Sequence, residues 1–231
     1  MTGVALIVGA GRGLSASLAR LLAREGFHVA LAARNIDKLA ALTAETGARA
    51  FACDATDAQQ VEATFQAVEA LWGSPDLAVF NAGFRVRGPL VELDPAKVQQ
   101  TLVASAFGGF LVAQSAARRM LPRGRGSIFF TGASASVKGF ANSSPFAMGK
   151  FALRGLAQSL ARELSPQGLH VAHFVIDGAI RQGADDPRIA QRGEDGVLLP
   201  DEIASTYLHV HRQHRSAWSW EVELRPWSEK F

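Results

Sequence analysis

The stretch "VALIVGAGRGLS", residues 4–15, joins a short apolar run to a turn that contains three glycines. An uninterrupted apolar run of this length is typical of a β-strand buried on both faces. Gly9, Gly11 and Gly13 permit a tight turn and a close approach of the backbone to a ligand. The leucines at 14, 18, 21 and 22 then recur with helical spacing. The stretch therefore predicts a strand, a phosphate-binding loop and a helix whose free N–H groups face an anion.

The rest of the chain repeats this strand-to-helix unit. Repeated alternation of this kind predicts an α/β fold, a Rossmann-type doubly wound parallel sheet of about seven strands between two helical layers. Because no change of composition marks a linker, we expect a single domain over residues 1–231. The further strands are expected at 28–33, 48–53, 77–82, 126–132, 169–176 and 218–224, with helices from about 36 and at 57–72, 95–120, 144–165 and 200–213.

The composition indicates a folded protein rather than a disordered one, since 48% of the residues are hydrophobic and 19% are charged. No apolar run reaches the roughly 18 residues of a membrane span, and Met1 leads directly into the first strand. Cys53 is the only cysteine, which excludes a disulfide framework and a cysteine-based metal site. We therefore expect a cytoplasmic protein with no membrane contact and no metal.

The net charge of +3 raises the alternative of a nucleic-acid-binding protein. The one local concentration of positive charge is "RRMLPRGRG", residues 118–126, where a helix ends and a turn begins. Cations at that position complement the negative end of a helix dipole, which is the interpretation we favour. We expect no nucleic-acid partner.

The glycine loop resembles that of the short-chain dehydrogenase/reductase family, which reads Thr-Gly-x-x-x-Gly-x-Gly. Val8 stands in place of the threonine and Ser15 in place of the last glycine. The pairs "CD" at 53–54 and "NAG" at 81–83 extend the resemblance over nearly the whole chain. It implies a nicotinamide dinucleotide cofactor. The expected contacts to that cofactor are Gly9, Gly11, Arg12, Gly13, Leu14, Arg34, Asp54, Asn81, Ala82, Gly83, Lys150, Gly178 and Ile180.

The end of the second strand, "AARN", bears on which cofactor is used. A carboxylate there accepts hydrogen bonds from the adenosine ribose and repels a 2′-phosphate. This chain has Ala33 at the position of that carboxylate, followed by Arg34, and the loop contributes Arg12. Two guanidinium groups can clamp a 2′-phosphate. We therefore predict NADP(H) rather than NAD(H); the alternative is that both arginines are only surface charges.

The segment "SSPFAMGK", residues 143–150, departs from the family pattern. The resemblance places a catalytic tyrosine, which protonates the substrate oxygen, at Phe146, and a lysine that binds the nicotinamide ribose at Lys150. The position of the substrate-polarising serine falls on Ala133, with Ser134 beside it. Ser105 stands where the family has an asparagine that holds a relay water. A positioned general acid is worth about 10² to 10⁴ in rate, so the loss of the tyrosine is costly.

Other groups could replace the missing acid. Asp177 follows the sixth strand, where a desolvated carboxyl can hold its proton at neutral pH; the alternative is that it caps a turn with Gly178. Ser134 can hydrogen-bond a carbonyl, although a hydroxyl is a weak acid. We interpret Tyr207, the only tyrosine, and the strand histidines His170 and His173 as packing residues.

Two functional hypotheses follow. The first is an NADP(H)-dependent oxidoreductase that acts on a small carbonyl, alcohol or activated double bond with a non-standard proton donor. The second is a catalytically inactive NADP-binding protein that serves as a sensor or partner subunit. The polar segment 180–200 is expected to form a loop that folds over a small-molecule substrate. Family resemblance and the aromatic residues Trp218, Trp220, Trp227 and Phe231 suggest a homodimer or homotetramer.

Overall fold

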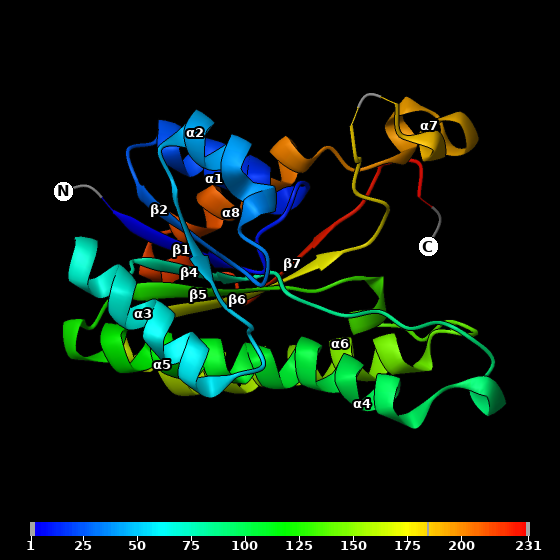
Figure 1. Cartoon of the computed structure of the whole chain (residues 1–231), viewed down its shortest axis with the longest axis horizontal. Helices are drawn as coiled ribbons and strands as arrows, with labels where there is room; N and C mark the ends of the chain where they lie inside the picture. The colour runs from blue at the N-terminus through cyan, green and yellow to red at the C-terminus, as the bar shows by residue number, and fades with distance from the viewer. Residues whose placement is uncertain (1–2, 184, 230–231) are drawn as a thin grey trace.

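A seven-stranded parallel sheet forms the centre of the protein in the computed structural model, which describes residues 3–183 and 185–229 (Figure 1). The strand order is β3-β2-β1-β4-β5-β6-β7. The chain leaves β1 in one direction to β2 and returns beside β1 as β4, so the order reverses between these two strands. Such a reversal opens a crevice at the carboxyl ends of the strands, where ligands bind. The strands are Val4–Val8, His28–Ala33, Arg49–Ala52, Leu77–Phe80, Gly126–Thr131, Leu169–Ile176 and Glu221–Leu224.

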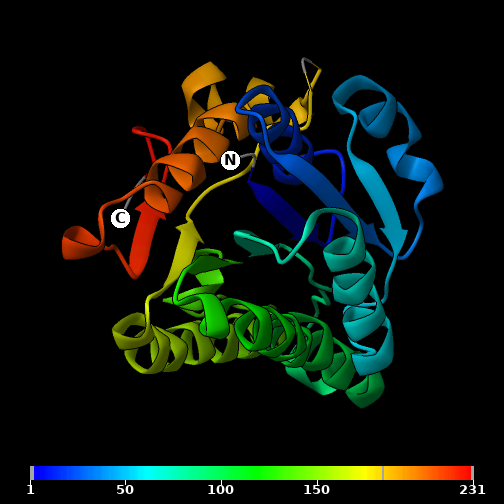
Figure 2. The same ribbon diagram turned by 90° about the vertical axis from the view of Figure 1, so that its left-hand side faces the viewer.

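Helices cover both faces of the sheet, as Figures 1 and 2 show from two directions. One layer holds α1, Leu14–Arg24, with α2, Ala40–Thr46, and α8, Pro200–His211. The other holds α3, Ala58–Trp72, with α4, Pro95–Leu102, α5, Gly108–Met120, and α6, Ser144–Leu164. Each layer packs its apolar side chains on one sheet face, which gives two buried clusters with the sheet between them. The three-layer Rossmann-type fold expected from the sequence is confirmed.

One predicted helix and one predicted strand differ in detail from the structure. The helix expected over 95–120 is interrupted by a π-helical turn, Val103–Phe107, which shifts the side chains of α5 relative to those of α4. The last strand begins at Glu221, so Trp220 lies outside it. Phe231 lies outside the described residues.

The segment expected to be a loop at 180–200 contains a short helix, α7, Pro187–Arg192, and is held at both ends. Leu198 donates its backbone N–H to Ala179 and accepts one from Arg181, so the two ends of the segment pair. Arg188 donates to the carbonyl of Ile180 at 2.6 Å and forms an ion pair with Asp186. The segment is therefore a folded excursion from the sheet rather than a loop without structure.

Candidate functional site

Gly9 brings the loop after β1 against the loop after β4. Its φ of +88° lies in the left-handed region, and a Cβ at this position would lie 2.3 Å from the backbone nitrogen of Ala82. Ser15 donates its hydroxyl to the carbonyl of Gly9 at 3.2 Å and accepts the Asn81 side-chain amide at 2.7 Å. Ser15 is buried, so this link is shielded from water. The departure from glycine at position 15 thus fastens the two loops together.

Gly11 and Gly13 serve a different purpose from Gly9. Neither has a positive φ in the left-handed region, and a Cβ at either position would meet no heavy atom within 4 Å. At these two positions the absence of a side chain leaves free space beside the loop. It is not required by the backbone conformation, as it is at Gly9. Gly13 is the N-cap of α1 with no side-chain cap, so free N–H groups of the first turn face that space. Free N–H groups and the positive end of the helix dipole together favour a phosphate there.

A cleft of about 530 Å³ lies along the carboxyl ends of β1, β2 and β4. It contains most of the residues predicted to bind the cofactor, and a smaller adjoining hollow brings Leu14 and Ile180 to the same loop. Gly178 lies elsewhere, since a Cβ there would be 2.7 Å from Cδ of Pro226. The cleft is bordered by Gly9, Gly11, Arg12, Arg34, Asp54, Asn81, Ala82 and Gly83, together with Ala10, Ala33, Asn35, Lys38, Leu39, Cys53, Ala55, Thr56, Phe84, Gln100, Val103 and Ala104.

Three cations border the part of the cleft next to β2. Arg12 and Arg34 were expected, and Lys38 joins them from the short 3-10 helix Asp37–Leu39. Within residues 3–183 and 185–229 none of the three forms an ion pair. Lys38 was not predicted from the sequence, because Arg34 follows β2 outside any helix and the spacing in "RNIDK" gives no helical signal. Exposed, unpaired cations around a cleft favour an anionic ligand.

Asp54 contributes a fixed acceptor group on the opposite wall of the cleft. Its carboxylate accepts the backbone N–H of Thr56 at 2.9 Å and the Thr56 hydroxyl at 2.7 Å, and its own backbone N–H donates to the Gln60 side chain. These bonds form a closed turn after β3. The predicted location of Asp54 at the cofactor cleft is consistent with this geometry.

Lys150 is buried where α6 crosses the end of β5. Its Nζ donates to the carbonyl oxygen of Thr131 at 2.7 Å, and burial lowers its pKa to about 8. A buried amine is costly, because burial disfavours the charged form. The Thr131 hydroxyl in turn shares a 2.9 Å hydrogen bond with Tyr207.

Phe146 lies between two cations. Nζ of Lys150 is 5.8 Å from the centroid of its ring, and Cζ of Arg85 is 4.6 Å from the same centroid. Both distances are within the range of cation–π attraction. Arg85 belongs to the loop that follows β4, and the sequence analysis did not identify it.

Ser105 occupies the π-helical turn between α4 and α5 and is buried, but its hydroxyl has no hydrogen-bond partner among the described residues. A Cβ on Gly149 would be 3.1 Å from that hydroxyl, and one on Gly83 would be 3.9 Å away. The turn therefore brings Ser105 between the cofactor loop and the helix that carries Lys150. Its placement agrees with the expected relay position.

Asp177 is the centre of a polar cluster after β6. Burial acts to raise its pKa, but hydrogen bonds from Ser134 and Lys138 and the charge of Arg225 outweigh it, so the pKa is lowered. Nζ of Lys138 is 3.2 Å from the Asp177 carboxylate, and the Arg225 guanidinium is 3.9 Å away. The hypothesis that Asp177 stores a proton at neutral pH is therefore not supported. The Ser134 hydroxyl is engaged by this carboxylate.

The other titratable candidates have structural partners. Tyr207 is fully buried, and burial raises its pKa well above the ordinary value. Burial lowers the pKa of His173 to about 4, and its Nδ1 lies 3.0 Å from the Glu221 carboxylate, which also binds Arg154. His170 contacts the carbonyl of Ser219. Their interpretation as packing residues agrees with these contacts.

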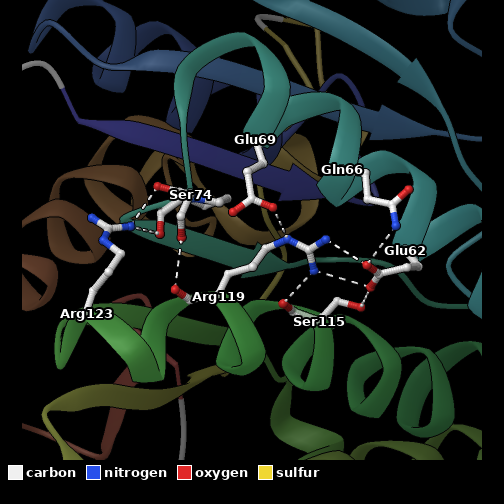
Figure 3. A network of polar contacts seen from close by, with 8 residues as sticks. Glu62, Gln66, Glu69, Ser74, Ser115, Arg119 and Arg123 are labelled. Carbon is white, nitrogen blue, oxygen red and sulfur yellow. Dashed lines mark hydrogen bonds and ion pairs between the residues drawn. The ribbon is translucent and has the colours of Figure 1, made fainter.

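Two of the four arginines in the basic stretch 118–126, Arg119 and Arg123, are paired within the chain, as Figure 3 shows. Arg119 of α5 reaches across to α3 and pairs with Glu62 at 2.7 Å and with Glu69 at 2.9 Å. The hydrogen bond from Arg119, with a further one from Ser115, lowers the pKa of Glu62 to about 2. Arg123 binds the carbonyl of Ser74 and the Asp76 carboxylate. Arg119 and Arg123 therefore serve to join α5 to α3 and to the turn before β4.

Two negative observations concern the described ranges only. No helix within them is long and apolar enough to cross a bilayer. No group of three or more histidine, cysteine, aspartate or glutamate side chains within them is arranged to hold a metal ion.

Residues 3–183 match the model of the family described as short chain dehydrogenase. A D-threitol dehydrogenase of Mycolicibacterium smegmatis is 33% identical over 73% of this chain and 66% of its own length. A glycine betaine reductase of Emericella nidulans is 28% identical over 98% of this chain but only 19% of its own length. The first curated relatives are thus matched over less than two thirds of their own length.

Solved structures match almost the entire chain. A short-chain dehydrogenase from Rhodopseudomonas palustris superposes with a TM-score of 0.84 at 35% identity, covering 97% of this chain and 99% of that one. A metagenomic short-chain oxidoreductase, crystallised in complex with NADP, gives 0.83 at 27% identity and covers 97% of each chain.

Proposed function

Because the chain belongs to the short-chain dehydrogenase family, we propose that it is an NADP(H)-dependent oxidoreductase of a small carbonyl compound, alcohol or activated double bond. The nicotinamide ring supplies or accepts the hydride when this cofactor is bound. The residues of the chain bind and orient the cofactor and manage the accompanying proton.

The loop residues support binding of the dinucleotide. The free space beside Gly11 and Gly13 and the uncapped N-terminus of α1 accommodate a pyrophosphate. Arg12, Arg34 and Lys38 support the choice of NADP(H), because they surround a site for a 2′-phosphate and have no carboxylate partner in the described chain. No acidic residue stands at the end of β2 to receive the ribose hydroxyls instead.

Lys150 is the observation that carries the catalytic part of the proposal. Burying the charged amine of a lysine costs folding free energy. If Lys150 served only to fill space, an apolar side chain at this position would make the fold more stable. With a pKa of about 8, its ammonium group is protonated at neutral pH and is a competent general acid. One of its N–H groups binds Thr131, which leaves others for ribose hydroxyls and for a water molecule that carries a proton to the substrate.

Three other residues have supporting roles in this proposal. Ser134 after β5 and Asp177 after β6 contact each other, so Asp177 orients the serine hydroxyl that polarises the substrate. Phe146 contributes its ring face and no proton. A double bond activated by a neighbouring group would make the smallest demand on the acid, since its proton is delivered to carbon.

The alternative is an NADP-binding protein without turnover, which the loss of the tyrosine favours. Both functions require cofactor binding, so they are separated by assaying the natural protein, Phe146→Tyr and Lys150→Met with NADPH on a panel of carbonyl compounds and enones. Turnover by the natural protein that Lys150→Met removes supports the enzyme. Turnover by Phe146→Tyr with a silent natural protein supports the alternative.

Assembly into a homodimer or homotetramer remains part of the proposal. Apolar side chains are exposed on neighbouring parts of α5 and α6: Phe110 is 40% exposed, Met148 50% and Phe151 44%. Their burial against a second copy would remove apolar surface from water. Light scattering at micromolar concentration tests this, and a monomer would contradict it. The cytoplasmic location stays a prediction.

A further inference from the structure

Arg85 lies beside Phe146, the residue at the position of the family's catalytic tyrosine. It lies in the segment 81–88 that follows β4, whose first residues border the cofactor cleft. The far end of that segment is fixed to the start of α6, because Gly88 donates its backbone N–H to the carbonyl of Asn142 at 3.0 Å. The guanidinium lies over the Phe146 ring, with Cζ 4.6 Å from the centroid. The position vacated by the tyrosine hydroxyl is thus next to a cation.

No carboxylate of the described chain compensates this cation. Other arginines of the chain do have carboxylate partners, as Arg119, Arg154 and Arg188 show. The pKa of Arg85 is lowered, first by burial and then by the like charge of Arg87, and no acidic group acts in the opposite direction.

The acidic groups after β6 and in β7 cannot serve as its partner. Asp177 is held by Ser134, Lys138 and Arg225. Glu221 binds Arg154 through both carboxylate oxygens and also faces His173. An exposed guanidinium without a counter-ion within the described chain is available to an anionic ligand.

The ring of Phe146 explains why an aromatic residue remains where the hydroxyl is lost. An aliphatic side chain would fill the space, but only an aromatic face attracts the guanidinium. Phe146 therefore acts as a platform that holds Arg85 in place.

We propose that Arg85, held on the Phe146 ring, binds an anionic group of the substrate, so that the substrate is a small carbonyl compound bearing a carboxylate or a phosphate. This inference rests on the proposed function, because it assigns the substrate class of the same site. A guanidinium presents two parallel N–H groups to either anion. The binding test uses one carboxylate ligand and one phosphate ligand, so it shows which of the two anions the site prefers.

The test measures binding by titration calorimetry to the protein saturated with NADP⁺, where no reduction occurs. Acetoacetate, its neutral methyl ester and dihydroxyacetone phosphate are compared. We expect one of the two anions to bind at least about 10-fold more tightly than the ester, and Arg85→Gln to remove that preference. Phe146→Tyr keeps an aromatic ring under Arg85 and should keep the preference for the anion over the ester. Phe146→Leu removes the ring and should reduce that preference about 3-fold. Arg118→Gln, an exposed arginine at the end of α5, is the matched control.

Equal binding of all three ligands, or an unchanged preference in Arg85→Gln, overturns the proposal. NADPH affinity is measured on the same samples, and Arg85→Gln is expected to leave it within about 2-fold, since Arg85 does not border the cofactor cleft. Failure to bind NADPH contradicts the proposed function. Normal NADPH binding without an anion preference contradicts only the role of Arg85.

Discussion

The nucleotide side and the reactive side of the cleft differ in what their charged groups contact. Beside β2, Arg12, Arg34 and Lys38 border the cleft without a carboxylate partner in the described chain. After β6, Asp177 is bound by cations and a hydroxyl from other segments. One side has its charges available to a ligand, and the other has most of them engaged within the protein. The difference teaches that cofactor binding and the proton chemistry can be altered separately in this fold.

Lys150→Met is expected to have the largest effect, because Lys150 is the one buried cation on the reactive side. If it supplies the proton, the rate falls by about 10² to 10⁴. Steady-state assays with NADPH on an active substrate measure this. Asp177→Asn is the matched control and retains activity within about 10-fold, since its carboxylate only orients Ser134. A larger loss in Asp177→Asn than in Lys150→Met would break the assignment.

The burial of Lys150 also has a consequence for stability. The folded pKa of about 8 lies below the ordinary lysine pKa of 10.5, so between these pH values the unfolded chain binds a proton that the folded chain does not. The free energy of unfolding therefore rises as the pH increases from 8 to 10.5, by about 3 kcal/mol from this group. Urea unfolding of the natural protein and Lys150→Met across this range isolates the effect as the difference between them. Parallel pH curves would show that Lys150 is not perturbed.

On the nucleotide side, Arg34→Gln is expected to weaken NADPH binding by about 10- to 100-fold, since each charge-assisted hydrogen bond contributes about 1.5–3 kcal/mol. NADH affinity should stay within about 2-fold, and Arg24→Gln, an exposed arginine in the last turn of α1, should change neither. Fluorescence titration with both cofactors makes the comparison. Tighter binding of NADH than of NADPH by the natural protein would refute the preference.

A smaller effect is expected for the phenol created by Phe146→Tyr. Lys150 and Arg85 lie close to the ring, so their charges should lower the pKa of the new phenol by about 1 unit or more from about 10. Ultraviolet titration reports it cleanly, because the natural chain has one tyrosine and burial raises its pKa. An ordinary phenol pKa would mean that neither cation acts on this position.

The fold could be predicted from the sequence because its signals are local. The apolar run of β1, the glycine turn and the leucine spacing of α1 all arise within residues 4–22. The two uses of glycine could not be separated in advance. Only the folded chain shows that Gly9 meets Ala82, whereas Gly11 and Gly13 leave open space.

The reactive side was predicted less completely, because its properties come from segments far apart in the sequence. A protonated Asp177 was one of two alternatives that the sequence left open, and Lys138 and Arg225 approach it from other loops and lower its pKa. The contact of Arg85 with Phe146 likewise joins the loop after β4 to α6. Local patterns carry no information on such contacts.

The pH dependence of hydride transfer tests the central claim most directly, namely that Lys150 takes over proton delivery while the nucleotide side still binds NADP(H). Single-turnover reduction by the natural protein, preloaded with NADPH, is followed between pH 6.5 and 9.5 by the loss of NADPH absorbance. The account predicts a rate that is constant below the Lys150 pKa of about 8 and falls tenfold per unit above it, with that fall absent in Lys150→Met. A rate independent of pH, or the same profile in both proteins, would contradict it.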